Sequence, residues 1–236
     1  MLNFKSLKKF WYNRKRLSFQ LNLLLIAVAL VMMTILSITG YILMRDAQNA
    51  LIEEKQAKLF SYAKQLDIAL DKTFDQKLIE KGLHNASREE KIKALNADLV
   101  EITDFVANSA PGIGVGYYAK ELDAIITYGP SKEMGDTVGQ SITDAHLGRK
   151  VLATGQQIVQ TANLVRGEIM NCMYPIIRDG EVLGYIWSNE LMEDINTQIN
   201  EMKNRFYFAI IVGIILVLIG VVTVAKFMRK NLRLIE

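Results

Sequence analysis

Two long apolar runs constrain the fold of this chain more than any other feature. The first covers residues 19–44 and contains no charged residue, and the second covers residues 206–225. About 20 apolar residues in a helix cross the hydrocarbon core of a bilayer, and a buried helix of a soluble domain rarely runs this far without a charge. The first run also exceeds the apolar region of a secretory signal peptide. We therefore predict two transmembrane helices, at residues 19–44 and 206–225, in a plasma membrane protein.

The basic residues gather at the two ends of the chain, next to the apolar runs. Residues 1–18 carry six Lys or Arg and no acid, and residues 226–236 carry four against Glu236. The ends hold +6 and +3 while the whole chain holds +3, which leaves −6 for the middle. The positive-inside rule then predicts a cytoplasmic N-terminus at 1–18, an extracytoplasmic domain at 45–205 and the cytoplasmic start of a signalling helix at 226–236. The basic ends are expected to contact anionic membrane lipids rather than nucleic acid.

Apolar residues spaced by three and four predict helices in the first half of the exterior domain. The first membrane helix is expected to continue outward as a long amphipathic helix to about Glu80 and to end at Gly82. Ser87 followed by Glu90 is typical of a capping box, and it predicts a second helix that ends before Pro111. The two apolar stripes consist of Leu59, Ala63, Leu66, Leu70, Phe74 and Leu78, and of Ile92, Leu95, Leu99, Ile102 and Val106.

From Ile113 onward the apolar period changes to two, which is typical of strands. Further strands are expected at 124–128, 157–161, 168–177 and 182–187, with a short helix at 144–153 and a return to helix after Asn189. Asp179-Gly180 between two apolar runs predicts a hairpin. Helices followed by hairpin-connected strands favour an α+β domain with an antiparallel sheet. The predicted fold is therefore two transmembrane helices flanking an α+β domain with a long N-terminal helix, a layout that resembles Cache-like (PAS-like) domains.

The motifs of most enzymes and metal sites are missing. The two histidines and the single cysteine, Cys172, form no zinc spacing, and no glycine-rich phosphate loop precedes a helix. Hydrolase nucleophile motifs are also absent. We therefore expect no catalytic residues, no metal and no cofactor, and no enzymatic activity of this chain itself.

Seven polar and aromatic residues in the strand half are candidates for binding a small molecule. His146 and Arg149 are three residues apart and would share a helix face, and Arg166 precedes a strand. An arginine matches a carboxylate in a bidentate manner, so a small carboxylate is the expected ligand. The alternatives are that the aromatic residues belong to the core and that Arg166 forms a surface ion pair. The other four candidates, on or beside strands, are Tyr128, Asn171, Tyr174 and Trp187.

Several runs between Arg88 and Ile195 resemble the sensor region of the acetoacetate-responsive two-component histidine kinases that control short-chain fatty acid catabolism in bacteria. This sequence has Leu147 where that family usually has proline after the histidine, which affects the expected loop shape. The matching runs are Arg88–Ala97, Pro111–Tyr118, Leu122–Tyr128, His146-x-Gly148-Arg149, Val165–Asn171, Pro175-Ile176 and Gly184–Leu191.

The resemblance implies a ligand-binding domain that signals through both membrane helices to a cytoplasmic kinase core, in a homodimer. In such kinases a PAS domain, a phosphoacceptor histidine and an ATP-binding domain follow the second span, and this sequence contains none of them. The chain is expected to be either the N-terminal portion of a longer kinase or a truncated sensor, with a response regulator as partner only through the missing core. Two alternatives stay open: a membrane adaptor that binds a cell-envelope protein, and an input module for a chemoreceptor or a cyclic-dinucleotide enzyme.

Overall fold

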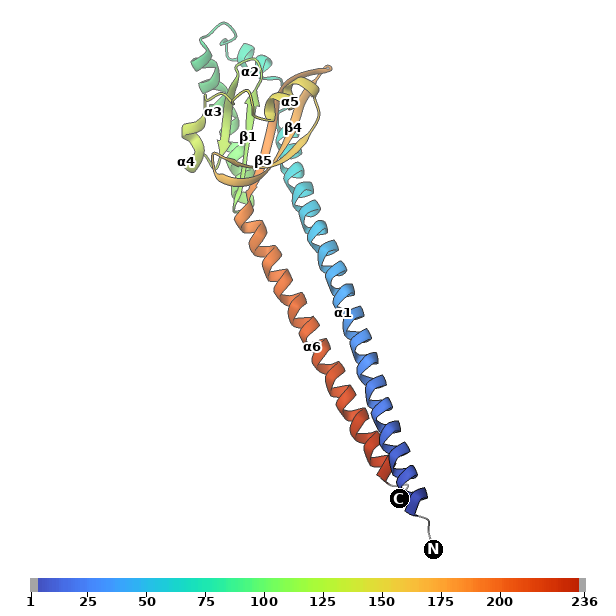
Figure 1. Cartoon of the computed structure of the whole chain (residues 1–236). Helices are drawn as coiled ribbons and strands as arrows, with labels where there is room; N and C mark the ends of the chain where they lie inside the picture. The colour runs from blue at the N-terminus through green and yellow to red at the C-terminus, as the bar shows by residue number, and fades with distance from the viewer. Residues whose placement is uncertain (1–3, 234–236) are drawn as a thin grey trace. The chain divides into compact units, whose positions relative to one another are not determined.

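The computed structural model describes residues 4–233, which divide into two compact units (Figure 1). One unit comprises the described residues up to Asn49 and those from Ile199 onward, and the other is Ala50–Gln198. Residues 1–3 and 234–236, the outermost parts of the predicted basic ends, lie outside the described residues.

The first unit consists of two helical segments that are long and apolar enough to cross a membrane. They belong to α1 (Phe4–Ala69) and α6 (Met192–Arg233), which contain the predicted spans and extend beyond them. Most of their large apolar side chains are exposed within the protein, as expected of a surface that faces lipid. Glycines allow the two segments to approach closely, because a Cβ on Gly40 would lie 2.7 Å from Ile210 Cδ1.

The helices of the second unit follow the predicted apolar stripes, but with one break that was not predicted. The continuous helix to Glu80 is wrong: α1 ends at Ala69, and a separate helix α2 covers Phe74–Glu80. Thr73 starts α2 through a capping box with Gln76, which satisfies backbone donors that a continuous helix would have bonded internally. Helix α3 (Arg88–Ser109) begins at the predicted capping box of Ser87 and Glu90.

The second half of this unit is a five-stranded antiparallel sheet of order β2-β1-β5-β4-β3, which confirms the predicted α+β class. The long N-terminal helix α1 that was predicted to precede this sheet is also present. The predicted hairpin is present, since Asp179 and Gly180 have φ of 51° and 83°. The strands are β1 (Ile113–Ala119), β2 (Ala124–Gly129), β3 (Ile158–Leu164), β4 (Gly167–Arg178) and β5 (Glu181–Leu191).

The sheet has two differently covered faces. On the first, which we call the helix face, the Tyr117 hydroxyl donates to the Leu66 carbonyl of α1 at 2.6 Å, and Thr127 meets Thr103 of α3 at 2.9 Å. The opposite face, the pocket face, carries an aromatic cluster and packs against α5 (Gly148–Thr154). The short helices α4 (Ser131–Met134) and η1 (Gly135–Thr137) follow β2. The helix predicted at 144–153 is wrong in its first turn, because residues 144–147 form turns and a bend before α5 begins.

Candidate functional site

A cavity of about 270 Å³ lies on the pocket face of the sheet. Its walls come from β2, from β3, β4 and β5 with the turn between β3 and β4, and from the segment between η1 and α5. Four of the seven predicted site residues line it: Tyr128, His146, Asn171 and Trp187. The other lining residues are Ile125, Gln140, Ser141, Ile142, Thr143, Leu164, Val165, Ile169, Tyr185 and Asn189.

Asn189 organises the polar end of this cavity. Its Nδ2 donates to the Tyr128 hydroxyl at 3.1 Å, and its Oδ1 accepts from Arg166 Nη1 at 2.9 Å. Gly114, the register partner of Asn189 on β1, makes room for these groups. A Cβ at Gly114 would lie 2.6 Å from Asn189 Oδ1 and 2.7 Å from Arg166 Nη1. A side chain at this position would therefore displace the cluster.

The hydroxyl of Tyr128 is poised to donate a hydrogen bond. Burial raises the pKa of Tyr128 above its ordinary value, so the phenol stays protonated at neutral pH. Because its oxygen already accepts from Asn189, its own proton is left for another acceptor.

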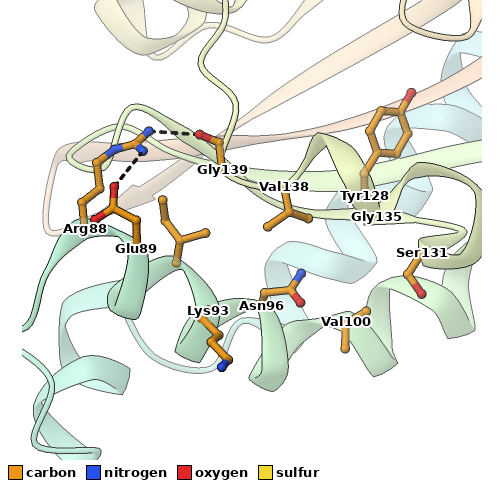
Figure 2. A pocket seen from close by; sticks show the side chains of 11 residues that line it. Arg88, Glu89, Lys93, Asn96, Val100, Tyr128, Ser131, Gly135, Val138 and Gly139 are labelled. Carbon is orange, nitrogen blue, oxygen red and sulfur yellow. Dashed lines mark hydrogen bonds and ion pairs between the residues drawn. The ribbon is translucent and has the colours of Figure 1, made fainter.

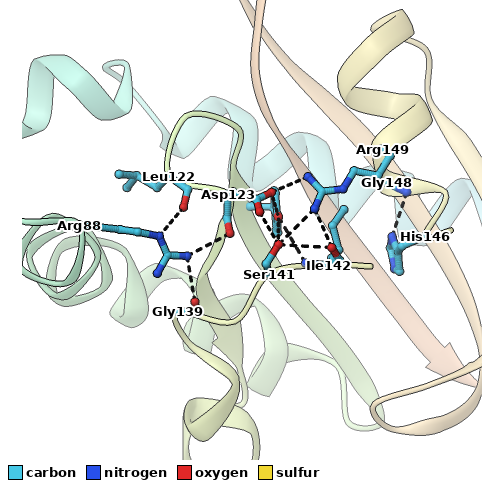
Figure 3. Close-up of polar contacts among 10 residues, drawn as sticks. Arg88, Leu122, Asp123, Gly139, Ser141, Ile142, His146, Gly148 and Arg149 are labelled. Carbon is cyan, nitrogen blue, oxygen red and sulfur yellow. Dashed lines mark hydrogen bonds and ion pairs between the residues drawn. The ribbon is translucent and has the colours of Figure 1, made fainter. Parts of the chain in front are cut away.

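His146 offers a second donor from the opposite wall. Its Nδ1 accepts the Gly148 backbone N–H at 2.9 Å, as Figure 3 shows. Burial lowers the pKa of His146, and the nearby Arg149 charge lowers it further. The ring is therefore neutral at pH 7, and with Nδ1 accepting, its proton lies on Nε2.

Arg166 is the cation nearest to this polar end. Its Nη1 donates only to uncharged acceptors, Asn189 Oδ1 and the Gly112 carbonyl, the latter at 3.1 Å. Among the side chains that the structure describes, no carboxylate forms an ion pair with it. The guanidinium has five N–H donors, so several stay available to an anion.

An aromatic wall closes the other side of the cavity. Trp187 meets Tyr128 edge-on with ring centroids 5.1 Å apart, and Tyr185 lies 6.0 Å from Trp187 and stacks on Tyr118 at 5.1 Å. The Trp187 ring lies over Gly116, which has no side chain to compete for that space. The cavity thus combines a mostly apolar surface with a few placed polar groups, which is usual for small-ligand sites.

Asn171 is a second buried amide of the cavity wall, beside Asn189. The residue is only 3% exposed, and its Oδ1 has no hydrogen-bond partner among the described residues. Buried amides are normally satisfied. Asn171 stands beside Asn189 in the β4–β5 register, so the two amides extend one polar strip across the sheet.

Arg149 does not line the cavity, contrary to the prediction that it shares a ligand-binding helix face with His146. Its guanidinium donates to the Asp123 carboxylate, to Ser141 Oγ and to the Ile142 carbonyl (Figure 3). Asp123 adopts a left-handed conformation in the β1–β2 turn, with φ of 44°. Arg149 is occupied by this internal ion pair, which sequence spacing could not indicate.

Tyr174 also lies away from the cavity. It stands three residues after Asn171 on β4, so its side chain belongs to the helix face. There the Lys64 ammonium of α1 lies 5.8 Å from the centre of its ring.

A larger space of about 480 Å³ lies between α3 and the segment from β2 to η1 (Figure 2). Arg88 at its edge donates to the backbone carbonyls of Leu122, Asp123 and Gly139, and Lys93 points away from the loop. The Tyr128 hydroxyl points away from this groove as well (Figure 2). Its polar side chains therefore do not converge on a common point, and the cavity on the pocket face is the better candidate site.

The segment from Gln140 to Thr143 was missed from the sequence. It carries no regular secondary structure, and its place over the sheet depends on contacts with Asp123 and Arg149. The apolar wall residues Ile125, Leu164 and Ile169 on strands, and Val165 in the β3–β4 turn, were also missed, because an apolar residue gives no sign of whether it faces a cavity or a core.

The fold and the cavity define a class of protein: an α+β domain with a cavity on one face of its sheet, whose first and last helices continue into apolar helical segments. Residues 21–197 match the model of the AtoS N-terminal domain family. The chain belongs to this family.

One relative agrees with this assignment. The chain is 39% identical over 225 residues to the signal transduction histidine-protein kinase AtoS of Escherichia coli K12, and the match covers 95% of this chain. It covers only 36% of that kinase, so the chain corresponds to about a third of its length. The resemblance to histidine kinase sensor regions seen in the sequence motifs is confirmed.

Solved sensor domains are more distant. The ligand-binding domain of the Campylobacter jejuni chemoreceptor Tlp3 with 4-methylisoleucine is 12% identical, with a TM-score of 0.47, covering 64% of this chain and 57% of its own. The E. coli DcuS sensor domain is 12% identical, with a TM-score of 0.40, covering 65% and 97%. Similarity at this level carries no information on the ligand.

Proposed function

We propose that this chain is the ligand-sensing input module of a membrane-bound histidine kinase, and that its cavity binds a small carboxylate or keto acid. The observation that carries the proposal is the set of donors in and beside a mostly apolar cavity. Tyr128 and His146 line it from two sides and each hold a free proton. Arg166 does not line the cavity itself, but it bonds to the lining residue Asn189 and has no carboxylate partner among the described residues.

These donors suit an anionic oxygen. Hydrogen bonds from a guanidinium to a carboxylate are about twice as strong as neutral ones, and the neutral His146 and Tyr128 add directional donors without a further charge. The aromatic wall of Tyr185 and Trp187 would take the hydrocarbon part. A cavity of about 270 Å³ holds the volume of about nine liquid waters, which favours acids of only a few carbon atoms.

The sheet offers a route from the cavity to the long helices. On β5, Asn189 faces the cavity and its neighbour Glu190 faces α1, where it pairs with Lys55 at 2.7 Å. The strand then leads directly into α6. A ligand that binds two states of the sheet unequally would shift their populations, and α1 and α6 would carry the change.

We further propose that both ends are cytoplasmic, that the module works as a homodimer, and that a kinase core passes the signal to a response regulator.

Thermal unfolding of the full chain in lipid nanodiscs tests the proposal. The ligands are straight-chain carboxylic and keto acids of two to six carbons, each paired with the corresponding uncharged amide. At 100 times Kd a ligand stabilises by about 2.7 kcal/mol, equivalent to roughly 5–10 °C for a domain of this size. We expect at least one acid, and not its amide, to raise the melting temperature. No shift with any acid at millimolar concentration would contradict the sensor function.

Two variants, each replacing one basic residue by glutamine, test where the acid binds. Arg166→Gln should weaken acid binding by about 10- to 100-fold, since a hydrogen bond to a charged group contributes about 1.5–3 kcal/mol. Lys150→Gln removes an exposed charge on α5 and is the matched control. Equal binding by both variants would show that Arg166 does not contact the acid.

A further inference from the structure

One irregular segment forms much of the cavity wall. Between Val138 and Leu147 the chain has no regular secondary structure, and we call this segment the pocket loop. Gln140, Ser141, Ile142, Thr143 and His146 from this loop line the cavity. The opposite wall is the sheet itself, whose strands are paired along their length, so we expect the position of the pocket loop to determine the size of the cavity.

Asp123 holds the centre of the pocket loop through its carboxylate. This carboxylate accepts from Ser141 Oγ of the loop, from Arg149 Nη1 and, at 2.6 Å, from the Tyr118 hydroxyl. Arg149 in turn donates to the Ile142 carbonyl at 2.6 Å. Asp123 and Arg149 thus bind two successive loop residues, and both are only partly exposed to solvent.

A second arginine fixes the start of the same loop. Arg88 of α3 donates to the Gly139 carbonyl at 3.2 Å and to the Asp123 carbonyl at 3.1 Å (Figure 3). The Asp123 backbone is therefore fixed from α3, while its side chain points to Ser141 and Arg149. The Arg149 guanidinium also holds the pKa of Asp123 well below its usual range, so the carboxylate stays ionised at any physiological pH.

We propose that Asp123 is a positioning residue for the ligand site: it holds the pocket loop closed through Arg149 and Ser141, and thereby limits the size of the acid that the cavity accepts. The inference rests on the proposed ligand site, but closure of the loop can be measured without any ligand. Backbone hydrogen bonds of Ile125 with Gly139 and Gln140, at 2.8 and 2.9 Å, hold the start of the loop without Asp123. Weakening Asp123 therefore releases the loop from Ser141 onward and leaves the sheet in place.

Trp187 provides the measurement, because it lines the cavity and is only 5% exposed. The chain has two tryptophans, so Trp11→Phe leaves Trp187 as the sole emitter. The full chain with this change is placed in lipid nanodiscs, and quenching by acrylamide, a small neutral probe, is recorded well below the melting temperature.

Asp123→Asn is the informative variant. Asparagine also tolerates the left-handed backbone at this position, so the change removes charge without adding strain. A neutral amide bonds Arg149 and Ser141 more weakly than the carboxylate does, so the loop should open more often and expose Trp187. We therefore expect the quenching constant to rise above that of the parent chain. The same rise is expected for Arg149→Met, and a smaller one for Arg149→Lys, which keeps the charge but loses the fork of donors. Asp136→Asn, an exposed acid on η1, is the control.

The outcomes distinguish the role of Asp123 in holding the pocket loop from the binding of an acid in the cavity. Quenching of Asp123→Asn equal to that of Asp136→Asn would overturn the inference, and if Asp123→Asn does not fold, Arg149→Lys decides in the same way. In the released variants, the binding preference between butanoate and octanoate should move toward octanoate by about tenfold. An unchanged preference would also overturn the inference. If no acid binds the parent chain but quenching is still raised in Asp123→Asn, the proposed function is overturned, while the conclusion that Asp123 holds the pocket loop is supported.

Discussion

The buried ion pair between α1 and β5 gives a sharp stability prediction. Lys55 Nζ lies 2.7 Å from Glu190 Oε1, and the two side chains are only 11% and 9% exposed. Glu190 Oε2 has no partner among the described residues, so Lys55 is the main compensation for this buried charge. Removal of one member of a buried pair leaves the other uncompensated and typically destabilises by about 3–5 kcal/mol.

The two single variants and the double variant should therefore behave differently. Lys55→Met and Glu190→Leu alone are each expected to lower the free energy of unfolding by about 3–5 kcal/mol, whereas Lys55→Met/Glu190→Leu should lose much less, because apolar replacement of both members is often neutral. For a domain of this size the single losses correspond to roughly 6–20 °C in melting temperature.

The assay is urea unfolding of the fragment 45–205, followed by Trp187 fluorescence and analysed as a double-mutant cycle. The two single losses sum to about 6–10 kcal/mol while the double variant loses much less, so a coupling energy of at least about 4 kcal/mol is expected. This exceeds the roughly 0.5–3 kcal/mol usual for residues in contact, because each single variant also leaves a buried charge unpaired. Two single variants that each lose less than about 1 kcal/mol, and that add in the double variant, would refute the view that this pair is buried and mutually dependent.

Three further predictions follow from the site and its supports. The folded-state pKa of His146 lies below its unfolded value, so the unfolded state binds more protons and stability falls as pH decreases from 7 through the ordinary histidine pKa. His146→Gln should remove this part of the pH dependence of the melting temperature. Identical pH profiles of the melting temperature for the variant and the parent chain would contradict the prediction. Gly114→Ala should abolish acid binding in a calorimetric titration and lower stability by about 1–3 kcal/mol through overpacking against Asn189 and Arg166. Ser87→Ala removes the capping box of α3 and should lower the unfolding free energy by about 1 kcal/mol. Acid affinity should not change, because Ser87 does not line the cavity; weaker acid binding would show that the start of α3, where Arg88 bonds the pocket loop, supports the site through its cap.

The elements of the fold could be predicted where local periodicity determines them. The stripes on α1 and α3 and the alternation of β1 depend on neighbouring residues, so they are visible in the sequence. The break between Ala69 and Phe74 was missed because the apolar spacing continues across it: Leu70 and Phe74 are both buried in the same core. The Thr73–Gln76 capping pair was a visible signal for a new helix start.

The candidate site could be predicted only in part. Its strands follow from local sequence patterns, whereas the position of its loop depends on contacts between residues far apart in the sequence. Tyr128, Asn171 and Trp187 were found because they lie on strands. The exclusion of Tyr174 could have been found too, because residues three apart on a strand point to opposite faces. The role of Arg149 could not, since its partner Asp123 is 26 residues away and meets it only in the folded chain.

The central claim is that a small acid enters the cavity on the pocket face of the sheet. The most direct measurement is the indole ¹⁵N–¹H spectrum of the full chain in nanodiscs, labelled only at tryptophan, during titration with the same series of acids. The chain has two tryptophans, so Trp11 serves as the internal reference for Trp187. We predict that at least one acid shifts the Trp187 signal to saturation, that Trp11 stays unchanged, and that Arg166→Gln requires a higher acid concentration for the same shift. A Trp187 signal that no acid moves, in a chain that remains folded, would contradict the claim.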